Sequence, residues 1–178
     1  DIKITPRGGG TGTNGQSLSA GIILDCSRHL NRILDVNVEE GWVRVQPGVV
    51  LDQLNDQLAP LGVFFAPNLS PSSRATLGGM INTDACGKGS RIYGRTSDHV
   101  LALTCILSDG AKLDVEPWEA EALAQVKSRD GLAGSALRTV DEIVTEKAEV
   151  IERVFPKLSR FLTGYNLAKV YGNDDGRF

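Results

Sequence analysis

The chain has 178 residues, of which 41% are hydrophobic and 23% are charged, and its formal net charge is −3 at pH 7. These values are ordinary for a soluble globular domain, and they argue against nucleic acid or an anionic membrane as the main partner. No apolar run approaches the ~20 residues that a membrane span needs. The three cysteines show no Cys-x-x-Cys spacing, which argues against a disulfide framework or a zinc site and favours a reducing compartment, the cytoplasm.

The first part of the chain alternates short strands with glycine-rich loops. The apolar patterns of residues 2–5 and 21–25 predict two strands, the second of them buried. Residues 33–38 and 42–47 both alternate between apolar and polar side chains, and Glu39-Glu40-Gly41 separates them. These two segments therefore predict a β-hairpin.

The middle of the chain combines a helix, a long loop and a second hairpin. Leucines spaced i, i+3 and i+7 in residues 51–58 predict a short amphipathic helix. Residues 63–67 are expected to be extended and to lead into a second loop system over residues 68–93. Residues 100–107 and 111–115 flank a Ser-Asp-Gly turn and predict another hairpin.

After Pro117 the apolar residues follow a helical period. Residues 119–127 predict one helix, and a longer helix is expected to end at Phe155 and Pro156. A further short helix is expected around residues 158–162, and residues 173–178 predict a turn. The apolar face of the longer helix, expected to lie in a core or an interface, consists of Leu137, Val140, Ile143, Val144, Ala148, Ile151 and Val154.

The first glycine-rich loop has the chemistry of a phosphate site. Glycines permit positive φ angles and close approach of a ligand to the backbone, and successive N–H groups in such a turn attract an anion. Thr11, Thr13 and Asn14 add polar donors. The loop lacks the Gly-Lys-Ser/Thr ending of a P-loop and the spacing of a Rossmann fingerprint. By itself the pattern also fits a glycine-rich surface turn.

A second loop strengthens the ligand interpretation. Residues 70–87 are dense in hydroxyl-bearing and small side chains, and residues 76–79 are expected to open a short helix whose N–H groups face an anion. Residues 87–94 continue this loop with Lys88 and Arg91. Two such segments, far apart in the chain, suggest a long ligand that is held from two sides.

These loops resemble those of a known family. Residues 6–12, 76–87, 93–94 and 100–110, in this order, are similar to the FAD-binding (PCMH-type) domain of the vanillyl-alcohol oxidase superfamily. Within it, the branch of D-lactate, glycolate and D-2-hydroxyglutarate dehydrogenases is the most similar, and the resemblance covers residues 2–115. Phe155-Pro156-Lys157-Leu158 and Gly164-Tyr165-Asn166-Leu167 are similar to large members that carry a C-terminal iron–sulfur domain outside this chain.

The resemblance implies a mixed α+β fold of two small α+β lobes with FAD between them, truncated at both ends. Residues 1–116 would form the FAD-binding core and residues 117–178 a helical, incomplete continuation. Backbone groups from Gly8 to Gly12 would hold the pyrophosphate, and the later residues would line the path of the flavin, ribityl chain and adenosine. The residues expected to contact FAD are Arg7, Gly8, Gly9, Gly10, Thr11, Gly12, Pro67, Thr76, Gly78, Gly79, Thr83, Ala85, Gly87 and Tyr93.

Four details refine this interpretation. Relatives with covalent FAD often carry a histidine in the first loop, whereas this chain has Thr11, so we expect non-covalent FAD. Many relatives have Asn at the position of Asp84, and a carboxylate repels phosphate, so direct contact of Asp84 with the cofactor phosphates is not expected. Trp42 and Trp118 are expected to pack in the protein rather than to stack on the flavin. The cationic side chains that could offset the charge of FAD are Arg7, Arg74, Lys88, Arg91 and Arg95.

The function implied by the resemblance is that of a flavin-dependent oxidoreductase acting on a D-2-hydroxy acid such as D-lactate, glycolate or D-2-hydroxyglutarate. Its catalytic residues and its electron acceptor would be contributed from outside this chain, and the chain has no expected metal ligands. The chain alone is expected to be inactive, to bind FAD weakly or not at all, and to self-associate through uncovered apolar surface. Peripheral membrane association of the intact protein stays open.

Two other functions fit the same loops. One is the FAD domain of a UDP-N-acetylenolpyruvoylglucosamine reductase-like enzyme, which uses NADPH. The other is a non-catalytic nucleotide-binding module, because a ring of N–H groups binds a phosphate whatever molecule carries it.

Overall fold

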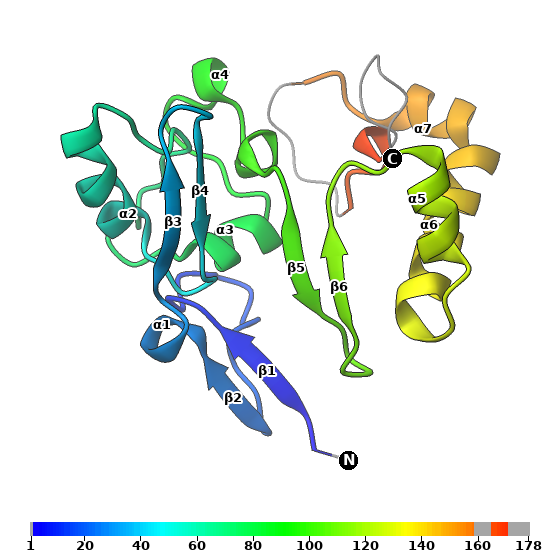
Figure 1. Ribbon diagram of the computed structural model, residues 1–178, viewed down its shortest axis with the longest axis horizontal. Coiled ribbons are helices and arrows are strands. Elements are labelled where there is room, and N and C mark those ends of the chain that lie inside the picture. The colour runs from blue at the N-terminus through cyan, green and yellow to red at the C-terminus, as the bar shows by residue number, and fades with distance from the viewer. Residues whose placement is uncertain (1, 159–164, 171–178) are drawn as a thin grey trace. The chain divides into compact units, whose positions relative to one another are not determined.

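The computed structural model describes residues 2–158 and 165–170, and it combines helices with two-stranded sheets (Figure 1). The predicted mixed α+β class is confirmed. Contacts divide the chain into two compact units, Asp1–His99 and Val100–Phe178, so the division lies upstream of residue 116, where the FAD-binding core was expected to end. Each unit has its own hydrophobic core.

The first unit opens with two parallel strands, β1 (Ile4–Arg7) and β2 (Ile22–Asp25), in which Ile4 pairs with Ile22. The prediction that the second strand is buried was wrong, because all four of its residues are exposed. Among the described residues β2 pairs only with β1, and a two-stranded sheet has too few partners to bury its own faces. The expected self-association would cover these apolar side chains. Helix α1 (Cys26–His29) follows directly and is capped by the Asp25 carboxylate.

The core of the first unit lies around one hairpin and one helix. Strands β3 (Ile33–Asn37) and β4 (Trp42–Val45) pair antiparallel, which confirms the predicted hairpin. Helix α2 (Leu51–Leu58) is also confirmed, and its three leucines are buried as their spacing predicts. A 3₁₀ turn, η1 (Ala59–Leu61), ends the helix. The leucines pack with Val49, Ala75, Leu77 and Met80, so the core reaches directly into the second loop.

The second loop system and the residues directly after it contain three short helical segments. These are α3 (Leu77–Asn82), α4 (Ser90–Tyr93) and the 3₁₀ turn η2 (Thr96–His99). Helix α3 begins after Thr76, as expected from the Thr-Leu-Gly-Gly pattern. Residues 63–69 before it form no helix or strand.

The second unit consists of a hairpin and helices. Strands β5 (Leu103–Ile106) and β6 (Lys112–Val115) pair antiparallel, and α5 (Ala120–Lys127) follows, as predicted. Trp118 is buried in the core of this unit with Leu113, Leu123, Val126 and Ala133, which confirms its packing role.

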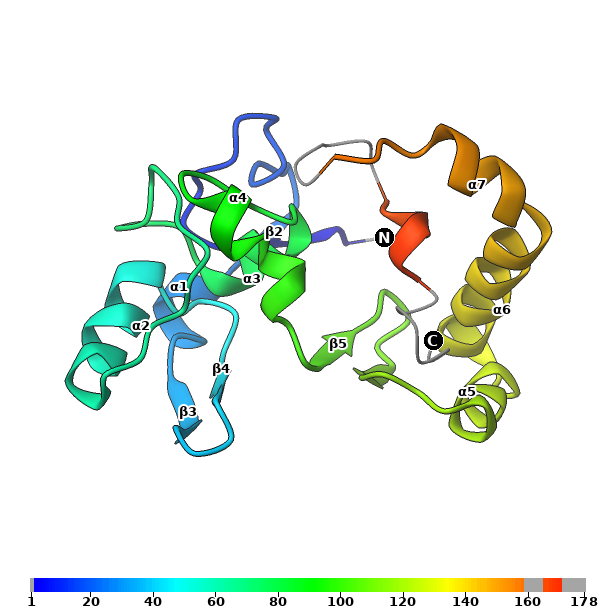
Figure 2. The ribbon, with the colours of Figure 1, turned by 90° about the horizontal axis from the view of Figure 1, so that it is seen from above.

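The predicted long helix is two helices, α6 (Gly131–Glu146) and α7 (Ala148–Val154). Lys147 separates them with φ −109° and ψ 14°, outside the helical range. Figure 2 shows α7 following on from α6. Because the apolar period continues across one non-helical residue, periodicity could not reveal the break. The predicted end at Phe155 is confirmed, and η3 (Leu167–Lys169) is a short 3₁₀ turn. Phe161 and Leu162 of the expected short helix, and the expected turn at 173–178, lie outside the described residues.

Candidate functional site

The two glycine-rich loops lie against each other. A Cβ atom added at Gly8 would overlap Oγ1 of Thr76, and one added at Gly9 would overlap the backbone carbonyl oxygen of Arg74. Only glycine allows this approach, since any side chain would push the loops apart. The structure therefore joins the end of β1 to the segment that opens α3, as the ligand interpretation requires.

Thr76 is the central polar group of this junction. Its side chain is 2% exposed, and Oγ1 is buried without a hydrogen-bond partner among the described residues. Thr76 is also the residue before α3, where a threonine oxygen usually accepts a hydrogen bond from an N–H of the first turn, but it makes no such bond here. A buried, unpaired hydroxyl costs free energy, so a ligand that supplied its partner would be favoured.

The first loop presents a run of unpaired donors. Within the described chain, the backbone N–H groups from Gly9 to Thr13 make no hydrogen bond. Gly10 has φ +68°, a left-handed conformation found in turns whose successive N–H groups face a common anion-binding hollow. A Cβ atom added there would meet the Arg7 guanidinium 2.8 Å away, so a positive charge lies beside this loop. Unpaired N–H groups beside an arginine suit a pyrophosphate.

Other expected cofactor residues shape the second loop rather than donate from their side chains. Gly78 packs on Pro47, and Gly87 approaches the carbonyl of Asn68 so closely that a Cβ atom would not fit. Pro67 is buried beside this approach. Thr83 donates its hydroxyl hydrogen to the Gly79 carbonyl at 3.0 Å. The hydroxyl hydrogen of Thr83 is therefore used within the chain, whereas its hydroxyl oxygen can still accept a hydrogen bond.

Tyr93 and the C-terminal part of the first loop are open to solvent. Tyr93 is 43% exposed, and its ring meets the Phe64 ring edge to face at 5.8 Å between centroids. Thr11 and Gly12 are exposed, and Gly12 lies against the side chain of Gln16. All the residues expected to contact FAD thus belong to the first unit.

Asp84 is held by an ion pair that sequence reasoning did not find. Its Oδ2 accepts a hydrogen bond from Arg95 Nη1 at 2.8 Å, and its Oδ1 accepts from the Ser97 N–H at 3.0 Å. Burial alone would raise the pKa of Asp84, but the hydrogen bonds from Ser97 and Arg95 outweigh it and lower the pKa below its ordinary value. The carboxylate is ionised and engaged within the loop, and Arg95 neutralises it rather than the cofactor.

This ion pair predicts a loss of stability in acid. The folded-state pKa of Asp84 is lowered, so its contribution is complete above the unfolded value of about 3.9 and is lost as the pH falls through the folded pKa. We expect Asp84→Asn to be less stable than the parent chain at pH 7 and the difference to shrink below about pH 4. Urea unfolding at several pH values measures it. A difference that stays constant down to pH 2.5 would contradict the assignment.

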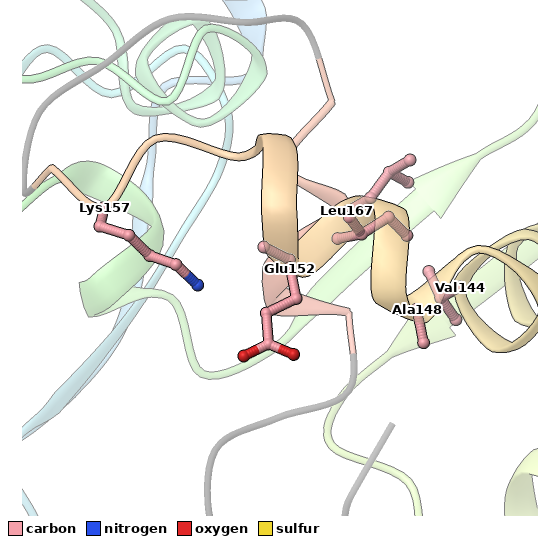
Figure 3. A pocket seen from close by; sticks show the side chains of 7 residues that line it. Val144, Ala148, Glu152, Lys157 and Leu167 are labelled. Atoms are coloured by element: carbon pink, nitrogen blue, oxygen red, sulfur yellow. The ribbon is translucent and has the colours of Figure 1, made fainter.

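The remaining features of the described residues point to no second site. No group of three or more His, Cys, Asp or Glu side chains in residues 2–158 and 165–170 could hold a metal ion. No helix in this part of the chain is long and apolar enough to cross a membrane. Figure 3 shows a pocket of the second unit lined by Val144, Ala148 and Leu167, with Glu152 and Lys157 beside them. None of the expected cofactor residues lines it.

Comparison with known proteins gives the family. Residues 1–116 match the FAD binding domain family. D-2-hydroxyglutarate dehydrogenase of Pseudomonas putida is 57% identical over 177 residues, which cover 99% of this chain and 18% of that protein. Glycolate oxidase subunit GlcD of Bacillus subtilis is 33% identical over 111 residues, 61% of this chain and 23% of that protein. The structure of an alkyldihydroxyacetonephosphate synthase is similar with a TM-score of 0.56 and 26% identity, over 65% of this chain and 23% of that one.

The family match includes both glycine-rich loops and the hairpin β5–β6. It confirms the resemblance that the order of these motifs suggested. The chain spans less than a fifth of the length of the D-2-hydroxyglutarate dehydrogenases that it matches. The two loops pack against each other, and the family match extends across both of them. The chain therefore belongs to the family of FAD-binding domains.

Proposed function

We propose that the two loops of the first unit hold FAD without a covalent bond. Backbone N–H groups of the first loop and the Arg7 guanidinium would bind the pyrophosphate, while Thr76 would donate its hydroxyl hydrogen to the cofactor. The observation that carries this proposal is the Thr76 hydroxyl, buried and unpaired where the loops meet. The other residues proposed to line the cofactor are Gly8, Gly9, Gly10, Thr11, Gly12, Pro67, Gly78, Gly79, Thr83, Ala85, Gly87 and Tyr93.

The intact protein is proposed to be a flavin-dependent dehydrogenase of a D-2-hydroxy acid, with D-2-hydroxyglutarate as the first substrate to test. The relative named for this substrate is similar over 99% of the chain, whereas the glycolate relative is similar over only 61%. When bound, the flavin supplies the two-electron acceptor for the oxidation. This chain's residues bind and orient it. An iron–sulfur cluster, the catalytic residues and the electron acceptor would belong to other parts of the protein, and the cytoplasm remains the predicted location.

The first test of FAD binding is a flavin titration of this chain beside a longer version with both flanks restored. We expect the longer version to bind one FAD and Thr76→Val to weaken its affinity about tenfold, the effect of losing one hydrogen bond. The same substitution should leave the stability of the FAD-free protein unchanged or raise it, because valine removes a buried polar group that has no partner. Flavin fluorescence and thermal unfolding measure the two effects.

Thr139→Val provides the control, because Thr139 is exposed on α6 in the second unit. It should change neither FAD affinity nor stability. If no version of the protein binds FAD, the loops serve another ligand and the proposal fails. If Thr76→Val binds FAD as tightly as the parent protein, the role given to its hydroxyl is wrong.

Assays of the full-length protein separate the remaining functions. Reduction of the bound flavin by D-2-hydroxyglutarate or D-lactate would support the dehydrogenase. Reduction by NADPH instead would support the enolpyruvyl reductase, and binding of adenine nucleotides without flavin would support a nucleotide-binding module.

A further inference from the structure

Three consecutive residues hold the loop between α3 and α4. The Arg95 guanidinium and the Ser97 N–H both donate to the Asp84 carboxylate. Between them, Thr96 donates twice to the Ala85 carbonyl oxygen, from its N–H at 3.1 Å and from its hydroxyl at 2.6 Å. Arg95 is 5% exposed and Thr96 is fully buried, so these donors are fixed in place by the surrounding protein.

The residue that they hold is strained. Asp84 has φ +44°, the only positive φ at a non-glycine residue in the described part of the chain. A left-handed conformation costs an aspartate about 1 kcal/mol or more, and it persists only where neighbouring contacts require it. The contacts from Arg95, Thr96 and Ser97 are of this kind, because they set the direction of the Asp84 side chain and of the Ala85 carbonyl together.

The direction of the Ala85 carbonyl also sets the direction of the next N–H group. The chain contains no cis peptide bond among its described residues, and in a planar trans peptide the carbonyl oxygen and the following N–H point in opposite directions. With the Ala85 carbonyl turned to Thr96, the Cys86 N–H points away from Thr96. Within the described chain this N–H makes no hydrogen bond. The loop therefore presents a fixed, unpaired donor among residues proposed to contact FAD.

We infer that Asp84, Arg95 and Thr96 are positioning residues that aim the Cys86 N–H at the cofactor as a hydrogen-bond donor. This inference rests on the proposed FAD function and adds to it a donor that sequence reasoning missed. No side chain of the three need touch FAD. Their effect passes through the backbone from Asp84 to Cys86.

The test uses the longer version with both flanks restored and compares FAD affinity with stability. Thr96→Val keeps the shape of the side chain but removes the hydroxyl that fixes the Ala85 carbonyl, and we expect FAD affinity to fall about tenfold. Thr96→Ser keeps the hydroxyl and should restore most of the affinity. Flavin fluorescence gives the affinity at a temperature where every variant is folded, as checked by circular dichroism.

A matched control is available in the second unit. The Thr104 hydroxyl donates to Asp114 at the same 2.6 Å, so Thr104→Val removes a hydrogen bond of the same length from an exposed position outside the loops. It should leave FAD affinity unchanged. The absorption band of the bound flavin is a further readout, because a change in donors to the cofactor shifts the band whereas a loss of stability does not.

A second pair of variants keeps the inference testable if Thr96→Val does not fold. Asp84→Ala removes both carboxylate oxygens and should weaken FAD binding about tenfold. Asp84→Asn keeps an acceptor and tolerates the left-handed conformation better than alanine does, so it should bind FAD more tightly than Asp84→Ala. If the parent protein binds FAD and these variants bind it equally well with an unshifted band, the positioning role is wrong while the FAD function stands. Failure of the parent protein to bind FAD would overturn both.

Discussion

Replacing Gly9 by alanine is expected to weaken FAD binding strongly. A Cβ atom at this position would overlap the backbone carbonyl oxygen of Arg74, and a backbone atom cannot move aside as a flexible side chain can. The two loops must separate to admit the methyl group, which we expect to cost about 1–3 kcal/mol of unfolding free energy. Because the proposed cofactor site lies where the loops meet, FAD affinity in the longer version should fall on the order of a hundredfold. Flavin titration and urea unfolding measure the two effects.

Gly41→Ala is the matched control for this variant. Gly41 has φ +73° in the β3–β4 turn, and a Cβ atom there would meet nothing within 4 Å. Alanine costs about 1–2 kcal/mol at such a position through backbone strain alone, so the control loses comparable stability without separating the loops. It should bind FAD as the parent protein does. Equal FAD affinity of Gly9→Ala and the parent protein would show that the loop contact is not part of the site.

Replacing Trp118 by alanine is expected to destabilise the second unit by about 3–5 kcal/mol, the usual cost of removing a buried tryptophan side chain. Trp118 is 7% exposed and packs with Leu113, Leu123 and Val126. FAD affinity should not change at a temperature where the protein is folded, because the residues proposed to contact FAD all belong to the first unit. Urea unfolding and flavin titration of the longer version check the two statements.

The variant Trp42→Ala tests whether the loss of stability in Trp118→Ala comes from the burial of the tryptophan. Trp42 is only partly buried, and its Nε1 donates to Glu40 at 2.6 Å. Its replacement should therefore cost less stability than that of Trp118, again with no effect on FAD. A marked loss of FAD affinity in Trp118→Ala, with the protein folded, would make Trp118 a flavin contact and contradict its assignment to the core.

The spacing of apolar residues and the presence of turn-forming residues were sufficient to predict the local helices and hairpins. Alternation predicted the hairpin β3–β4, the Ser-Asp-Gly turn predicted the hairpin β5–β6, and leucine spacing predicted α2 together with its buried face. These elements depend on interactions between residues that are near in the sequence, which a pattern records directly. A single non-helical residue, Lys147, leaves that pattern unchanged, so the division between α6 and α7 was missed.

The sequence predicted which loops form the candidate site, but it did not predict the contacts that their side chains make. The order of the glycine motifs identified the family, and these motifs carry the backbone freedom that a phosphate site needs. The unpaired Thr76 hydroxyl was not visible from sequence, because a hydroxyl is unpaired only when its whole surroundings are known. Asp84 was expected to avoid the cofactor phosphates and Arg95 was a candidate to offset the charge of FAD, and only the fold showed that the two side chains pair with each other.

The sequence by itself determined the fold class, the two hairpins, helices α2 and α5, and the presence of two loops with the chemistry of a phosphate site, because these follow from the type and spacing of residues that are near in the chain. Only the tertiary structure decided that Gly8 and Gly9 meet Thr76 and Arg74, that the strand at residues 22–25 is exposed, and that Arg95 holds Asp84. Each of these depends on contacts between segments distant in the chain. Burial and hydrogen bonding are properties of such contacts, and no local pattern of residues encodes them.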